Sequence, residues 1–115
     1  MTTKIKSITE DTIKFDNGYE LSFYHEQDCC ENHYLDFTHI EPSDYEGLEF
    51  DLSGDNFFER LPGFGIALLP TNNYPLRIPG YADNNGYYNS ELRLELQTPD
   101  KRVIYDITDC QDWRD

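Results

Sequence analysis

The chain has 115 residues, a formal net charge of −14, 37% hydrophobic residues and 15% aromatic residues. This length predicts a single domain over residues 1–115, and the aromatic content supplies enough apolar area for a core, which argues against a disordered chain. No Lys or Arg occurs between Lys14 and Arg60, whereas thirteen acidic residues do. The negative field of this region disfavours direct binding of nucleic acid through it, and favours basic proteins or cations instead.

The beginning of the chain predicts a β-hairpin. Ile5 and Ile8 lie in a short opening strand, and Thr12 to Phe15 forms the next one. Asp16-Asn17-Gly18 supplies the residues that tolerate positive φ in a tight turn. In the returning strand, Tyr19, Leu21 and Phe23 alternate with polar residues. These strands therefore present one apolar face to a core.

A short helix is expected to follow. Asp28 is a good N-cap, and Glu31 three residues later completes a capping-box pattern. Cys30, Tyr34 and Phe37 recur at helical spacing and predict one buried stripe. His39 and Ile40 are expected to lead out of the helix, and Glu41-Pro42 to end it, because the residue before a proline avoids helical geometry.

The second half predicts further strands. Leu48, Phe50 and Leu52 alternate with acidic residues, and Phe57-Phe58 is expected to anchor the next loop. Gly63 to Leu69 is apolar enough for a central strand. Near the end, Leu92 to Gln97 and Val103 to Ile107 form a second hairpin around the turn Thr98-Pro99-Asp100-Lys101.

Residues 70–90 are expected to be mostly irregular. They contain three Pro, two Gly, five Asn and four Tyr, and only Leu76 to Ile78 predicts a short strand. A long irregular segment in a compact domain is often functional, and Tyr with Asn is typical of recognition surfaces. The alternative is that these tyrosines cover a small core. The predicted fold is α+β but mostly β, an antiparallel sheet of about six to eight short strands with one short helix packed on it.

A metal site is one hypothesis for the stretch from His25 to His33. On a helix, His25, Cys29 and His33 would lie along one face, and Cys30 would be a fourth ligand. Imidazole and thiolate suit Zn²⁺ in tetrahedral geometry. The simpler alternative is a buried Cys30 with locally hydrogen-bonded histidines. No cofactor is expected, with zinc as the alternative.

A cysteine nucleophile in this stretch is less favoured. Glu26, Asp28 and Glu31 flank the cysteine pair, and nearby negative charge disfavours a thiolate. The sequence contains no phosphate-binding glycine loop and no zincin motif. No catalytic residue is therefore predicted, and the chain is interpreted as leaning away from an enzyme.

The cysteines and hydropathy indicate a compartment. Two of the three cysteines are adjacent, which does not fit a disulfide scaffold and favours a reducing environment. The opening residues predict no secretory signal, and no apolar run approaches the roughly 18 residues of a membrane span. The expected location is cytoplasmic.

Three motifs carry a resemblance. The run His25-Glu-Gln-Asp-Cys-Cys-Glu31, together with Gly63-Phe-Gly-Ile-Ala67 and Asn85-Gly-Tyr-Tyr-Asn-Ser-Glu91, resembles a small uncharacterised family of bacteria and their phages. The resemblance covers most of the chain. It implies a bacterial or phage intracellular setting and no known activity, cofactor or site residue.

Two functions follow from these observations. The first is a non-enzymatic binding or inhibitor protein whose acidic face engages a basic protein partner, as a nucleic-acid mimic. The residues expected to contact that partner are acidic or aromatic: Glu41, Asp44, Glu46, Glu49, Asp51, Asp55, Tyr81, Tyr87 and Tyr88. The alternative is a metal- or small-ligand-binding domain, hydrolase-like, centred on His25, Cys29, Cys30 and His33. The simplest explanation of the acidic surface is solubility alone.

Overall fold

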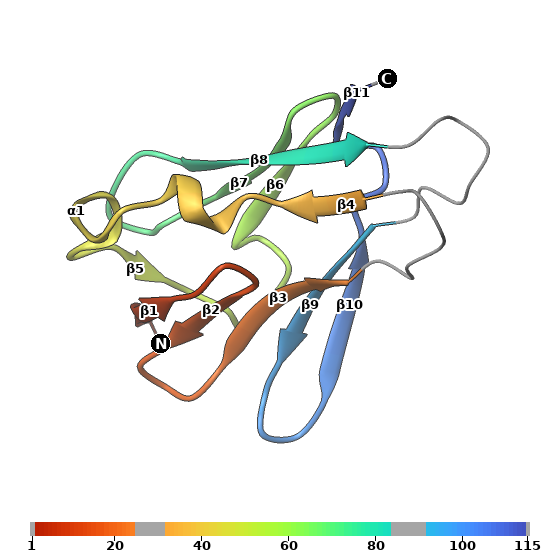
Figure 1. Ribbon diagram of the computed structural model, residues 1–115. Helices are drawn as coiled ribbons and strands as arrows, with labels where there is room; N and C mark the ends of the chain where they lie inside the picture. Colours follow the sequence, from red (N-terminus) through yellow and green to blue (C-terminus); the bar gives the residue numbers. More distant parts are fainter. Residues whose placement is uncertain (1, 25–31, 84–91, 115) are drawn as a thin grey trace.

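The protein consists of two β-sheets that enclose one hydrophobic core (Figure 1). The structure is a computed structural model that describes residues 2–24, 32–83 and 92–114. The first sheet has six strands in the order β10-β9-β3-β2-β1-β5, and the second has five, in the order β11-β8-β7-β6 with β4 also paired to β8. All strand pairs are antiparallel except β11 with β8, which is parallel.

The six-stranded sheet is built from the two predicted hairpins. Its strands are β1 (Thr3–Ile8), β2 (Thr12–Phe15), β3 (Glu20–Tyr24), β5 (Glu49–Phe50), β9 (Arg93–Gln97) and β10 (Arg102–Asp106). Gly18 makes the first turn with a φ of 90°, as its place in the Asp-Asn-Gly run predicts. The hairpins join through β3 and β9, where Leu21 pairs with Leu96 and Phe23 with Leu94. The alternation of Leu94 and Leu96 with polar residues therefore directs one face of this sheet to the core.

The five-stranded sheet is organised around one long strand, β8. Its strands are β4 (Asn32–Leu35), β6 (Phe58–Leu61), β7 (Gly65–Leu68), β8 (Leu76–Asp83) and β11 (Asp112–Arg114). The predicted central strand is confirmed as β7, which is buried throughout between β6 and β8. One edge of β8 pairs with β7 from Leu76 to Pro79 and then with β11, while its other edge pairs with β4.

The helix expected after Asp28 is wrong from residue 32 onward, and residues 28–31 lie outside the described residues. Residues 32–35 form β4, followed by a 3₁₀ turn, η1 (Phe37–His39), and by a one-turn helix, α1 (Pro42–Tyr45). Leu35 and Phe37 are fully buried, and the residues beside each of them are more exposed. This period of two is a strand pattern, and pairing with β8 overrides the local capping signal. No residue of α1 is buried, so residues 2–24, 32–83 and 92–114 are nearly all β and contain no packed helix.

The prediction for residues 70–90 is also corrected in part. β8 is the longest strand described and includes Pro79 and Gly80, two residues that strands usually avoid. The carbonyl of Pro79 accepts from the amide of Asp36, just beyond the end of β4. The backbone of Pro79 therefore faces Asp36, just past the last residue of β4, so its missing amide hydrogen removes no bond between β4 and β8. Residues 84–90 lie outside the described part of the chain.

The core combines side chains of both sheets. Fully buried residues include Ile13, Leu21, Phe50 and Leu94 from the first sheet and Leu35, Ile66, Leu68 and Ile78 from the second, with Phe37 and Phe57 from the connections. Phe57 and Phe58 are buried, but a strand, β6, and not the expected loop begins at Phe58. Both rings contact Tyr105 of β10, with centroids 5.8 and 5.0 Å away. These rings close the space between β6 and β10 at one side of the core.

Candidate functional site: an acidic end built by α1 and β5

The candidate site begins where the chain crosses from one sheet to the other. After β4 the chain passes through η1 and α1 to β5, at the edge of the six-stranded sheet (Figure 1). The amide of Glu41 donates to the Asp44 carboxylate at 2.9 Å, and the amide of Asp44 donates to the carbonyl of Glu41 at 2.8 Å. Buried Leu48 and Phe50 then fix the segment to the core. Local hydrogen bonds thus shape α1, and two apolar anchors hold it in place.

This crossing carries six carboxylates with no basic residue between them. They are Glu41, Asp44, Glu46, Glu49, Asp51 and Asp55, of which Glu49 is partly buried and the others are exposed. Among the described residues, none of these six carboxylates forms an ion pair, whereas Glu95 pairs with Arg102 elsewhere in the same sheet as β5. We call residues 41–55 the acidic segment. Its charge is presented to solvent.

Asp51 has an additional reason to stay ionised. Its Oδ1 accepts from the Ser53 hydroxyl at 2.6 Å and from the Ser53 amide at 3.0 Å. These two hydrogen bonds lower the pKa of Asp51 below its ordinary value, because they favour the charged carboxylate. The charge of this residue therefore persists into mildly acidic solution.

A loop from the other sheet adds an exposed aromatic ring next to the acidic segment. Asn72, between β7 and β8, accepts from the Glu49 amide at 3.1 Å and donates to the Gly47 carbonyl at 3.0 Å. Thr71 also donates its amide to the Glu49 carbonyl at 2.7 Å. Two residues further along, Tyr74 is 87% exposed. Residues 41–51 of the acidic segment and the loop of residues 71–74 together form what we call the acidic end.

In the sequence, Tyr74 is one of the four tyrosines of residues 70–90, and nothing in the sequence distinguishes it from the other three. Its place beside the acidic segment depends on the hydrogen bond between Asn72 and Glu49 of β5, two residues that are 23 positions apart in the chain. The only signal in the sequence was the run Thr71-Asn72-Asn73-Tyr74 itself, which is typical of a turn.

The structure separates the remaining predicted contact residues from this end. Tyr81 lies five residues beyond Leu76 along β8, about 17 Å away, where its ring packs on Tyr34 with centroids 5.4 Å apart. Asp55 lines a separate groove of about 620 Å³ with Tyr19 and Tyr105. Tyr87 and Tyr88 lie outside the described residues. The predicted set is therefore not one surface, and the four residues Glu41, Asp44, Glu46 and Glu49 form its compact part.

The predicted metal cluster is mostly outside the described chain. His25, Cys29 and Cys30 fall there, and the structure gives only the backbone of His33, in β4 opposite Ala82. Among the residues that are described, no group of three or more His, Cys, Asp and Glu side chains is arranged to hold a metal ion. The helical face expected to align these ligands is replaced by a strand at His33.

Cys110, the third cysteine, is buried and forms no disulfide. Burial raises the pKa of its thiol, because a buried thiolate loses its hydration. This cysteine therefore has the properties of a small hydrophobic residue rather than of a nucleophile.

A second concave region lies at the junction of β4 and η1. A cavity of about 500 Å³ is lined by the turn between β1 and β2, by β3 and by the β4–η1 junction. Glu10, Asp11 and Asp36 contribute its carboxylates, and Phe23 and Tyr34 contribute its rings. Asp36 is used structurally, since its Oδ1 accepts from the Thr38 amide at 3.1 Å and from the Thr38 hydroxyl.

Comparison with known proteins adds a family. A family model described as a domain of unknown function, DUF7448, matches residues 1–94. The chain belongs to the DUF7448 family. The matched region of this DUF7448 protein ends within β9 and includes the whole acidic end. No curated protein and no solved structure matches the chain. No helix in the described part is both long and apolar enough to cross a membrane.

Proposed function

We propose that this DUF7448 protein is a non-enzymatic binding protein that engages a basic protein partner through its acidic end. The observation that carries the proposal is the exposure of Glu41, Asp44 and Glu46 on a turn without any ion pair among the described residues. Carboxylates held in this way retain their full long-range field. They favour fast association with a positively charged surface and reject a negatively charged one.

Tyr74 supports the same surface. Tyrosine is enriched among the residues that contribute most to protein–protein binding energy. Its ring buries a large apolar area, and its hydroxyl can form a hydrogen bond. At 87% exposure its ring is nearly all in solvent. The loop is held to β5 by Asn72 and Thr71, so ordering it costs little on binding. Acidic side chains steer the partner, and Tyr74 supplies contact area.

The class of partner that best suits this surface is a nucleic-acid-binding protein. Its groove is lined by Lys and Arg that contact phosphates, and a set of solvated carboxylates satisfies the same donors. We accordingly propose that the protein acts as a nucleic-acid mimic that inhibits such a partner in the cytoplasm of a bacterium or of a phage-infected bacterium. The setting rests on the resemblance of its motifs to bacterial and phage proteins.

The test compares two variants with equal charge. Glu41→Gln, Asp44→Asn and Glu46→Gln together remove three charges from the acidic end and keep hydrogen-bonding oxygens. The control combines Glu10→Gln, Glu59→Gln and Asp100→Asn, three exposed carboxylates elsewhere. Each immobilised protein is exposed to bacterial lysate and washed with increasing salt.

We expect basic nucleic-acid-binding proteins to be retained by the wild type and the control and lost from the acidic-end variant. Raising salt from about 0.1 M to about 1 M shortens the Debye length from roughly 10 Å to roughly 3 Å and should release them. Duplex DNA should displace them as a competitor. Equal retention by both variants would refute the acidic end as the contact, and retention unaffected by DNA would refute the mimicry.

A further inference from the structure

The inference concerns the free edge of β10. This strand ends the six-stranded sheet, and within the described chain its only strand partner is β9, from Arg102 opposite Gln97 to Asp106 opposite Arg93. Its other edge is therefore open for pairing. Natural edge strands are commonly blocked by a proline, a bulge or a charged side chain; the run Arg102-Val-Ile-Tyr-Asp106 has no proline and no bulge, and its two charges lie at its ends.

The direction of each backbone group on β10 follows from hydrogen bonds at both of its ends. At the turn, the Thr98 amide donates to the Lys101 carbonyl at 2.9 Å, and after β10 the Ile107 amide donates to the Leu92 carbonyl at 3.0 Å. Bonding alternates along an antiparallel pair, so Val103 and Tyr105 bond to β9. The amides and carbonyls of Arg102, Ile104 and Asp106 therefore point to the open edge.

An independent contact confirms this direction at one residue. The Asp106 carbonyl accepts from Nε of Arg60 on β6 at 3.0 Å, which requires it to point away from β9. A carbonyl has two lone pairs and can accept a second hydrogen bond. Arg60 therefore contacts the open edge at Asp106 only, and the backbone amide and carbonyl of Ile104 form no hydrogen bond with it.

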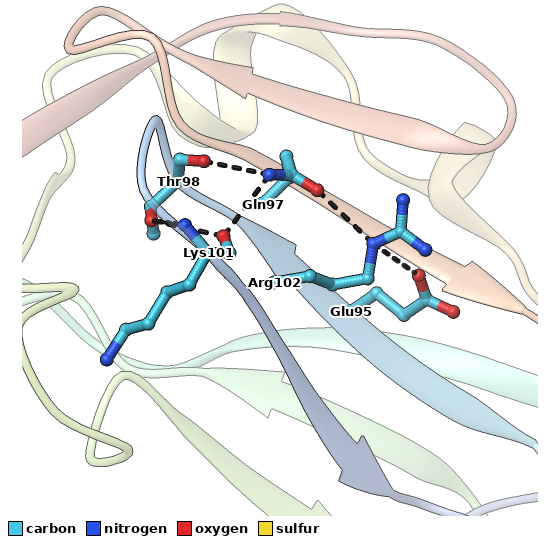
Figure 2. A network of polar contacts seen from close by, with 5 residues as sticks. All are labelled: Glu95, Gln97, Thr98, Lys101 and Arg102. Atoms are coloured by element: carbon cyan, nitrogen blue, oxygen red, sulfur yellow. Dashed lines mark hydrogen bonds and ion pairs between the residues drawn. The ribbon is translucent and has the colours of Figure 1, made fainter.

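The hairpin that presents this edge is held in shape by its own polar side chains (Figure 2). Nε2 of Gln97 donates to the carbonyls of Thr98 at 2.8 Å and Lys101 at 3.2 Å. Nε of Arg102 donates to Oε1 of Gln97 at 3.2 Å and pairs with Oε1 of Glu95 at 3.5 Å. The strand is thus organised before any partner arrives, which lowers the entropic cost of pairing.

The sequence of the edge is complementary to itself. Arg102, Ile104 and Asp106 lie on the outer face of the sheet, and Ile104 is 52% exposed, an uncommon place for isoleucine. If a second copy pairs antiparallel about Ile104, the two isoleucines meet at the two-fold axis. Arg102 of each copy then faces Asp106 of the other, and Val103 faces Tyr105. Opposite charges and aromatic–β-branched pairs are the cross-strand combinations that stabilise sheets.

We propose that two copies of this protein associate through antiparallel pairing of their β10 strands, centred on Ile104. The two six-stranded sheets then continue into each other. One patch of surface serves both copies, as a closed two-fold dimer requires. β5 lies at the opposite edge of the same sheet, so the dimer leaves both acidic ends free and does not depend on the proposed function.

The test exchanges the charges of the pair. Asp106→Arg places like charges opposite each other twice, because the symmetry repeats the pair, and Arg102→Asp does the same with the other sign. Each variant alone is expected to weaken self-association roughly tenfold or more. An equimolar mixture of the two restores both attractive pairs and is expected to form a mixed dimer. Sedimentation velocity over a concentration series, at about 0.15 M salt, measures each case.

Amide hydrogen exchange locates the contact. In the wild type, the amides of Arg102, Ile104 and Asp106 should become protected as concentration rises, whereas exposed turn amides should not change. Because Asp106→Arg also loses bonds to Thr108, Ile104→Asp is a second disrupting variant that removes no described hydrogen bond. A wild type that stays monomeric throughout, a dimer that survives both charge variants, or a mixture that stays monomeric would each overturn the proposal.

Discussion

Replacing Gly80 by alanine tests the close packing at the centre of the five-stranded sheet. A Cβ atom on Gly80 would lie 2.4 Å from the carbonyl oxygen of Cys110 and 3.2 Å from Cδ2 of Leu35. The first neighbour is backbone at the bend before β11 and cannot rotate away. Overpacking in a well-packed core typically costs 1–3 kcal/mol, and a backbone clash belongs at the upper end. We expect Gly80→Ala to lower the free energy of unfolding by about 3 kcal/mol, or the melting temperature by roughly 12 °C.

The matched control is Gly54→Ala. No atom lies within 4 Å of a Cβ built there, so this variant should change stability by no more than about 0.5 kcal/mol. Urea unfolding followed by far-UV circular dichroism measures both variants against the wild type. A Gly80→Ala protein as stable as the Gly54→Ala control would refute the close approach of β8 to residue 110.

The remaining predictions concern a turn, the core, a cap and a thiol. Gly18→Ala, at a φ of 90°, should cost about 1 kcal/mol in urea unfolding. Leu21→Ala, fully buried, should cost 2–5 kcal/mol by the same assay. The Thr108 hydroxyl and amide bonds lower the pKa of Asp106, so they stabilise the fold above the ordinary pKa near 3.8, and this contribution is lost as pH falls through the lower folded value. Thr108→Val removes the hydroxyl bond to this solvent-screened carboxylate and the bond from the Leu92 amide, so it should destabilise at pH 7 and by a smaller amount at pH 3, and the difference between the two reports the Asp106 bond. Cys110 should react with iodoacetamide, mapped by peptide mass, only after unfolding; rapid native labelling would contradict its burial.

The hairpins could be predicted because their signals are local. Asn17-Gly18 fixes one turn and Thr98 to Lys101 fixes another, and the strands beside them alternate cleanly between apolar and polar residues. The buried faces follow directly, since Leu21, Leu94 and Leu96 are all at most 2% exposed. The hydrogen bonds that close the two turns are local, from the Gly18 amide to the Phe15 carbonyl and from the Thr98 amide to the Lys101 carbonyl.

The five-stranded sheet could not be predicted in the same way. Tyr34 and Phe37 have helical spacing, but Leu35 and Phe37 have strand spacing, and pairing with β8 decides between the two. β8 itself contains Pro79 and Gly80, which argue against a strand when read alone. Pro79 is allowed there because its backbone faces Asp36, just past the end of β4, and Gly80 is needed because the Cys110 carbonyl leaves no room for a Cβ atom. Such pairing is set by tertiary contacts, which override local propensity.

The candidate site was predictable in charge and not in shape. The gap in Lys and Arg between Lys14 and Arg60 is visible in the sequence, and four of the predicted carboxylates, from Glu41 to Glu49, share one end of the molecule. The contribution of Tyr74 depends on the hydrogen bonds of Asn72 to β5. These bonds join two sheets, and no spacing rule along the chain encodes them.

The position of β8 has a consequence for the order of folding. Its neighbours come from residues 32–35, 65–68 and 112–114, so during synthesis the strand appears long before its last partner. Until residue 114 has emerged, the edge of β8 from Tyr81 to Asp83 is open on the side where β11 later pairs. Contacts between segments so distant in the chain close slowly, and an unpaired strand edge favours association between chains. A nascent chain is therefore most exposed to aggregation in the interval between β8 and β11.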